Sequence, residues 1–124
     1  MTKTTTIAAG LLGVLLIATA AWAEPVNYTW SGPGINTQGS TKCPGYKMTI
    51  DIMVDGDKVS GRFQQEGRPE RKFETTRNAQ GAIKTKAELG QGNTIEVVGA
   101  INDKEQKILL DGYCKFDAKK LIRK

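Results

Sequence analysis

The chain has 124 residues, of which 18 are Lys or Arg and 13 are Asp or Glu, so its formal net charge is +5. This mild excess does not indicate a nucleic-acid-binding protein, and it mainly sets solubility and a weak attraction for anionic partners. The chain has no histidine, the commonest general base and metal ligand, and its acidic residues are dispersed. We therefore expect no catalytic site, no metal site and no cofactor.

Residues 1–23 carry the pattern of a secretory signal peptide. Lys3 is the only charge, an apolar run extends to about Ala21, and Ala21 and Ala23 form a small-residue cleavage site. Cleavage after Ala23 would leave a single domain over residues 24–124. An uncleaved membrane anchor is the alternative, but the run is short for a bilayer span of about 20 residues. We expect a bacterial periplasmic or secreted protein without a transmembrane segment after cleavage.

The stretch from Tyr46 to Phe63 predicts a β-hairpin. Apolar and polar residues alternate on both sides of Asp55-Gly56, a dipeptide that favours a two-residue type I′ turn. Such a turn places Ile52 opposite Val59. One face of the hairpin is then apolar and the other mostly polar, as expected for a sheet that covers a core.

Four further turn sequences extend this alternation towards the C-terminus, each with Gly, Pro, Asn or charged residues. They are Gly67-Arg68-Pro69, Asn78-Ala79-Gln80, Gly90-Gln91-Gly92 and Lys104-Glu105. The pairs expected across them are Phe63–Phe73, Thr75–Ile83, Ala87–Ile95 and Ile101–Ile108. The predicted strands are residues 46–54, 58–66, 70–77, 81–89, 93–101 and 106–116, with a shorter one around 27–31 and a candidate eighth at 119–123.

The pattern predicts an all-β domain, because no segment has a helical apolar period. The residues expected on the inner face are Met48, Ile50, Ile52, Phe63, Phe73, Ile83, Ile95, Val97, Ile101, Ile108 and Leu110. Gly61, Gly99 and Gly112 share that face, where a glycine marks a bulge, a bend or a close approach. We expect a small up-and-down meander of seven or eight antiparallel strands in a closed or nearly closed barrel, with a β-sandwich as the alternative.

Cys43 and Cys114 are the two cysteines of the chain, so only one pairing is open to them. In an exported protein a disulfide is the expected state; two free thiols are the alternative. This bridge would join the two ends of the meander.

In arrangement, the predicted meander resembles the calycin barrels, the group that includes lipocalins, avidins and small bacterial protease inhibitors. Lipocalins carry Gly-x-Trp on their first strand, whereas this chain has the order Trp30-Ser31-Gly32. The resemblance is therefore architectural, and no functional residue of that group can be carried over to this sequence.

Two groups of residues are candidate binding residues. The basic cluster around the second hairpin consists of Arg62, Arg68, Arg71, Lys72 and Arg77. Guanidinium groups at a barrel rim bind carboxylates or phosphates in bidentate fashion; the alternative is a solvated hairpin partly balanced by neighbouring glutamates.

The segment from Asn27 to Tyr46 is the second candidate. It contains Trp30 and Tyr46 in a stretch otherwise rich in Gly, Ser, Thr and Pro, and such aromatic residues are preferred anchors for partners. The alternative is that Trp30 closes one end of the barrel.

These features favour an exported, non-enzymatic protein that binds a small ligand at one barrel mouth, near Trp30, Tyr46 and the basic cluster. A protein-interaction module, such as an inhibitor of an exported enzyme, and a structural envelope protein are the alternatives. The sequence leaves open the ligand or partner, the oligomeric state and the pairing of residues 117–124.

Overall fold

The computed structural model describes residues 24–124 and consists of β-strands with one short 3-10 turn, η3 (Cys43–Gly45). The strands are β1 (Val26–Pro33), β2 (Lys47–Asp55), β3 (Lys58–Gln65), β4 (Arg71–Thr76), β5 (Ala82–Gly90), β6 (Asn93–Ile101), β7 (Gln106–Asp111), β8 (Lys115–Ala118) and β9 (Ile122–Arg123). The expected signal peptide lies outside the described residues. Those residues contain no helix that is long and apolar enough to cross a membrane.

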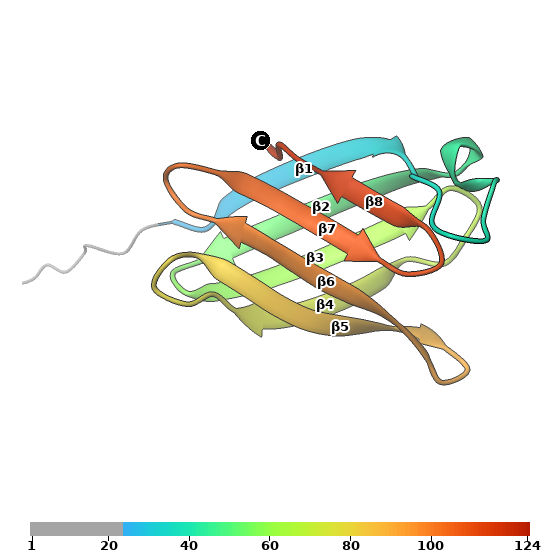
Figure 1. Cartoon of the computed structure of the whole chain (residues 1–124). Helices are drawn as coiled ribbons and strands as arrows, with labels where there is room; N and C mark the ends of the chain where they lie inside the picture. The colour runs from blue at the N-terminus through green and yellow to red at the C-terminus, as the bar shows by residue number, and fades with distance from the viewer. Residues whose placement is uncertain (1–23) are drawn as a thin grey trace, which may run out of the picture.

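The strands form two antiparallel sheets that lie face to face (Figure 1). One sheet has the order β4-β3-β2-β1-β9 and the other the order β5-β6-β7-β8. The described strands do not close into the barrel that the sequence favoured; the β-sandwich, its alternative, fits. Ile35, in the loop after β1, forms an isolated bridge with Lys115 of β8, in which each residue's N–H donates to the other's carbonyl at 2.7 and 3.1 Å.

The core confirms the predicted inner face. Every apolar side chain expected there is buried, and all of them belong to one cluster shared by the two sheets. Alternation of apolar and polar residues sets which way a strand faces, so this part of the fold follows directly from the pattern. Phe116, Ala118 and Leu121 complete the core from the C-terminal segment.

The pairing partners differ from those expected in three hairpins. Ile52 lies opposite Gly61 instead of Val59, because the two-residue turn is Gly56-Asp57, with Gly56 at a φ of 66°. A glycine at the first central position with positive φ is typical of a type II′ turn. The next hairpin is also offset by two residues, in the opposite direction, and Phe63 pairs with Arg71 instead of Phe73. A shift of two leaves every side chain on its predicted face.

The last hairpin is offset in the same way, and its second strand is shorter than expected. Ile101 lies opposite Gln106 instead of Ile108, and the strand predicted over residues 106–116 is divided into β7 and β8 by a turn. By contrast, the β5–β6 register, with Ala87 opposite Ile95, is as predicted.

The predicted hairpin between β4 and β5 is wrong. These strands belong to different sheets, so Thr75 does not pair with Ile83. At this corner the Asn78 side chain accepts hydrogen bonds at 2.9 Å from the N–H groups of Gln80 and Ala82. The amide oxygen therefore satisfies backbone groups where the chain changes sheets.

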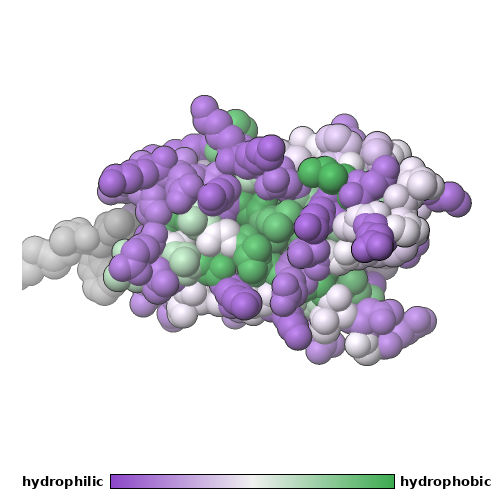
Figure 2. All heavy atoms as spheres, viewed as in Figure 1, coloured by the Kyte–Doolittle hydropathy of each residue, from purple (hydrophilic) through white to green (hydrophobic). Residues whose placement is uncertain are grey.

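The outer face of the β5–β8 sheet carries a small apolar centre. Hydrophobic atoms gather in the middle of the face shown in Figure 2, with hydrophilic side chains around them. Val98 of β6 and Leu109 of β7 are cross-strand partners on this outer side and are half-buried. Such a pair stabilises the sheet by roughly 0.2–1 kcal/mol.

Candidate functional site

An open cavity of about 310 Å³ lies between the two sheets at one end of the sandwich. It is at the end where Figure 1 shows the loop after β1 and the turns β3–β4, β5–β6 and β7–β8. We call it the end cavity. It is lined by Tyr46, Met48, Phe63, Gln65, Arg68, Pro69, Arg71, Leu89, Ile95, Tyr113, Cys114 and Phe116.

The interior of the end cavity is apolar. Met48 and Phe63 come from one sheet and Ile95 and Phe116 from the other, and all four are at most 6% exposed. They are inward residues close to the strand ends at this side of the sandwich, so the core continues into the cavity without a polar layer. Transfer of apolar surface from water into such a lining is favourable.

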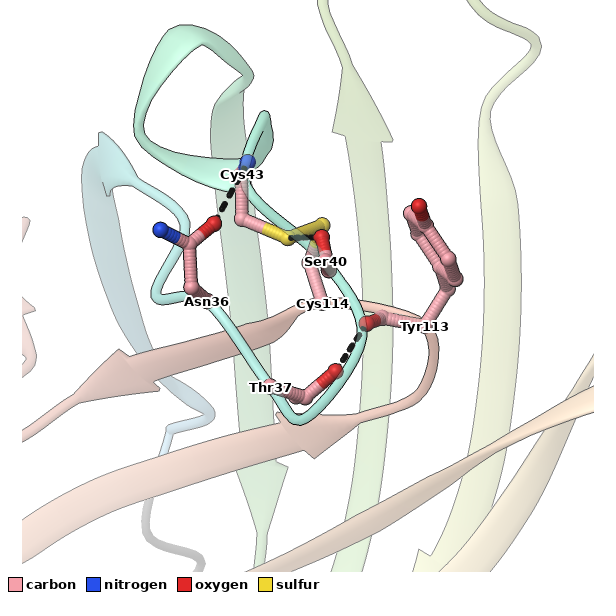
Figure 3. The surroundings of a disulfide bond; sticks show 6 residues. All are labelled: Asn36, Thr37, Ser40, Cys43, Tyr113 and Cys114. Carbon is pink, nitrogen blue, oxygen red and sulfur yellow. Dashed lines mark hydrogen bonds between the residues drawn. A yellow bond between two sulfur atoms is a disulfide. The ribbon is translucent and has the colours of Figure 1, made fainter.

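A disulfide between Cys43 and Cys114 fixes one wall of the cavity, as the sequence predicted. The Cα atoms are 5.6 Å apart, within the usual range for a disulfide. Both residues are buried, and Ser40 Oγ lies 2.9 Å from Cys43 Sγ. The bridge ties the segment 34–46, which we call the disulfide loop, to the β7–β8 turn (Figure 3).

Two further hydrogen bonds hold the disulfide loop in place. Cys43 N–H donates to Asn36 Oδ1 at 3.0 Å, and Thr37 Oγ1 donates to the carbonyl of Tyr113 at 2.7 Å (Figure 3). The first bond lies within the loop, and the second attaches the loop to the β7–β8 turn. A pre-organised loop loses less conformational entropy when a ligand or partner binds.

Arg71 and Arg68 stand at the rim of the end cavity. Arg71 leaves β4 on the inward side, opposite Phe63, and its guanidinium lies about 3.6 Å from the position that a Cβ of Gly90 would occupy. The side chain thus reaches from the edge strand of one sheet to the edge strand of the other. Gly90 has a φ of 89°, a conformation that favours glycine and leaves the space above it to Arg71.

A second hollow, of about 590 Å³, lies on the outer side of the same arginines. We call it the outer recess. It shares Arg68, Pro69, Arg71, Leu89 and Tyr113 with the end cavity and adds Gly90, Gln91, Asn93 and Thr94 of the β5–β6 hairpin. The arginines therefore border both hollows, and the residues that only the outer recess adds are polar residues and a glycine.

Tyr113 is a site residue that the sequence reasoning missed. It lies in the β7–β8 turn, is 69% exposed, and lines both hollows. Figure 3 shows its ring directed away from the disulfide loop. Gly112, directly before Tyr113, is a residue type common in turns and could have indicated the turn. Residues 106–116 were instead predicted to form one uninterrupted strand.

The structure brings only some of the predicted binding residues together. Tyr46, Arg68 and Arg71 share the end cavity. Trp30 is not among its lining residues; it is half-buried on β1, packs against the core and covers Gly32.

The other basic residues of the predicted cluster lie elsewhere. Arg62 and Lys72 are cross-strand partners that line a different hollow on the β1–β4 sheet. Arg77 lies at the β4–β5 corner and donates to the carbonyls of Gly56 at 2.9 Å and Ile101 at 2.7 Å. It therefore holds three turns together at the opposite end of the sandwich from the end cavity.

Asp51 forms a small charged network on the outer side of β2. Its carboxylate lies 3.1 Å from Lys124 Nζ and 3.6 Å from Arg62 Nε. Partial burial raises the pKa of Asp51, but the hydrogen bonds from Lys124 and Thr29 and the charges of Lys124 and Arg62 together hold it below its ordinary value of 3.8. A lowered carboxyl pKa stabilises the fold above pH 3.8, and this contribution is lost as the pH falls through the lowered value.

We predict that Asp51→Asn lowers the free energy of unfolding by roughly 0.5–1 kcal/mol at pH 7, the range for partly exposed ion pairs. As the pH falls through the lowered pKa, the wild-type carboxyl becomes protonated, so the difference in stability should be smaller at about pH 2 than at about pH 7. Urea unfolding at both pH values measures this difference. An equal loss of stability at both values would show that the ion pairs are not its cause.

Within residues 24–124, no group of three or more His, Cys, Asp or Glu side chains is placed to hold a metal ion. No protein-family model, curated protein or solved structure matches the chain. Because a fold alone does not determine function, the function has to be inferred from the chemistry of the end cavity.

Proposed function

We propose that this chain is an exported, non-enzymatic protein that binds a small ligand in the end cavity. The observation that carries the proposal is an open apolar cavity of about 310 Å³ with a few polar groups at its rim. This volume is at the lower end of the range for small-molecule sites, and it equals roughly ten water molecules at about 30 Å³ each. The signal-peptide pattern of residues 1–23 supports export, as does the disulfide, which is typical of oxidising compartments.

The polar groups at the end cavity support binding over catalysis. They are the side chains of Tyr46, Gln65, Arg68, Arg71 and Tyr113, and Cys114 is oxidised. A general base or an activated nucleophile needs a carboxylate, an imidazole or a thiolate in reach. None of the described residues that line the cavity supplies one.

We predict that Leu89→Trp blocks the cavity without unfolding the protein. Leu89 is half-buried at the rim, so a larger side chain can extend into the open volume without displacing the core. The probe is phenylnaphthylamine, an uncharged aromatic dye whose fluorescence rises on transfer from water to an apolar site. Wild-type protein should bind it saturably, and the variant should bind it about tenfold more weakly or worse, a loss of about 1.4 kcal/mol.

The matched control is Ile122→Trp, which adds the same side chain at a residue that is 55% exposed and lies outside the cavity lining. It should bind the dye as the wild type does. Absence of saturable binding to the wild type, or equal binding by the two tryptophan variants, would contradict the proposed site.

A protein-interaction module is the second candidate, and the exposed side chains around the disulfide loop favour it. Ile35, within the disulfide loop, is 47% exposed, and Tyr113, in the turn that the disulfide joins to this loop, is 69% exposed. If the ligand is a protein, Ile35→Asp should abolish its capture while Leu89→Trp retains it. The opposite result supports the small-ligand site.

A further inference from the structure

We infer that the ligand of the end cavity is an amphipathic oxyanion: a carboxylate, phosphate or sulfonate group attached to an apolar body. This inference rests on the proposed function and adds the chemical class of the ligand. The oxyanion would lie at Arg68 and Arg71, and the apolar body would enter the space between the sheets.

The first support is that the guanidinium groups of the two rim arginines have no ion-pair or hydrogen-bond partner among the described residues. The ion pairs among residues 24–124 involve Arg62 and Lys124 with Asp51, and Lys107 with Glu105. No ion pair or side-chain hydrogen bond joins the guanidinium of Arg68 or Arg71 to another described residue. Each guanidinium therefore keeps its donors available for a bidentate oxyanion.

The second support is that no acidic side chain lines either hollow: among the described residues, neither the end cavity nor the outer recess has an Asp or a Glu in its lining. The chain carries a formal net charge of +5, which adds a weak long-range attraction. A cation placed between the two arginines would be repelled.

The third support is the position of Arg71. It is half-buried, and it spans the gap between β4 and β5 with its guanidinium over Gly90. A partly desolvated guanidinium interacts with an anion more strongly than a fully solvated one does. An arginine that only kept the surface soluble would not need to cross between the sheets.

The fourth support is the order of environments along the opening. Inside the arginines lie Met48, Phe63, Ile95 and Phe116, and outside them lie the polar residues of the β5–β6 hairpin. A molecule with an apolar body and one charged group matches this order. A uniformly polar sugar or a purely apolar molecule matches only half of it.

A pair of dyes that differ by one charged group tests the inference. Anilinonaphthalene sulfonate has the skeleton of phenylnaphthylamine with a sulfonate added. The oxidised wild-type protein should bind the sulfonate dye at least about tenfold more tightly than the neutral one, as expected for charge-assisted hydrogen bonds. Isothermal titration calorimetry measures both affinities.

The variant Arg68→Gln/Arg71→Gln should lose this preference and retain binding of the neutral dye. Its charge-matched control is Arg62→Gln/Lys72→Gln, which removes two positive charges from the other face of the β1–β4 sheet and should keep the preference. Equal affinity of the wild type for both dyes, or an unchanged preference in the Arg68/Arg71 variant, would overturn the inference. Thermal unfolding of each variant shows whether it is folded.

Competition distinguishes the source of the oxyanion. Decanoate, decyl phosphate and decanol have similar apolar chains and differ in the head group. If either anion displaces the sulfonate dye at a lower concentration than decanol does, the inference is supported. The anion that acts at the lower concentration identifies the preferred head group. Displacement by decanol at equal concentration overturns it but leaves the proposed function intact. If the wild type binds neither dye, both the inference and the proposed function fail.

Discussion

Replacement of both cysteines by alanine is expected to lower the free energy of unfolding by about 4 kcal/mol. The bridge between Cys43 and Cys114 spans 71 positions of sequence, and on the chain-entropy model a loop of this length strongly restricts the unfolded chain. The change also removes the sulfur that faces the buried hydroxyl of Ser40 at 2.9 Å. Urea unfolding of the double variant and the oxidised wild type measures the difference.

Reduction provides the control for this prediction. A thiol reductant should destabilise the wild type by a similar amount and leave the double variant unchanged. Because Cys114 lines the end cavity, the loss of the bridge should also weaken dye binding. A difference below about 1 kcal/mol between the oxidised wild type and the variant would show that the loop is held mainly by Asn36 and Thr37.

Gly99→Ala is expected to cost about 3 kcal/mol, the upper part of the range for overpacking a core. Gly99 lies between Ile83 of β5 and Ile108 of β7. A Cβ at this position would collide with the carbonyl oxygen of Lys107 and lie 3.1 Å from Ile108 Cα. These are backbone atoms of the neighbouring strand, so relief of the collision would require β7 to move away from β6.

The control for Gly99 is Gly45→Ala. Gly45 ends η3, its φ is not positive, and a Cβ there would have no atom within 4 Å. This change should alter stability by less than about 0.5 kcal/mol. Equal effects of the two substitutions would mean that β6 and β7 adjust to an added methyl group, and that the close approach has no energetic consequence.

The inner face of the sandwich could be predicted from the sequence because successive side chains of a β-strand point to opposite faces of the sheet. Ile50, Val97 and Leu110 each belong to a run in which every second residue of the strand is apolar or glycine, and each is fully buried. The same period explains why the partners were harder to predict. A shift of two residues, as between Ile52 and Gly61, leaves the pattern of faces unchanged, and only the turn geometry decides between the two registers.

The sheet that each strand joins could not be read from the pattern. A strand that follows a turn has the same alternation whether it pairs with its predecessor or crosses to the opposite sheet. At Asn78 the chain crosses, and this crossing makes the domain a sandwich of two sheets. The separation of β4 from β5 also creates the gap that Arg71 spans.

The predicted basic cluster was divided because neighbouring residues of a strand face opposite ways. Arg71 faces inward at the cavity, whereas Lys72 and Arg62 lie on the other face of the sheet. The alternation of side chains along β4 explains why Arg71 faces inward, but membership of one cavity depends on the turns that meet at one end of the sandwich. Tyr113 joins the site through such a turn, and turns in this chain were predicted less accurately than faces.

An NMR titration of the isotope-labelled, oxidised protein with decanoate tests directly whether a ligand binds between the two sheets. If the end cavity binds an amphipathic anion, the amide signals of Arg71, Leu89 and Tyr113 should shift together and saturate. Those of Asp51 and Arg62, on the other face of the β1–β4 sheet, should stay in place. Shifts centred on another surface, or no saturable shifts at all, would contradict a ligand site between the sheets.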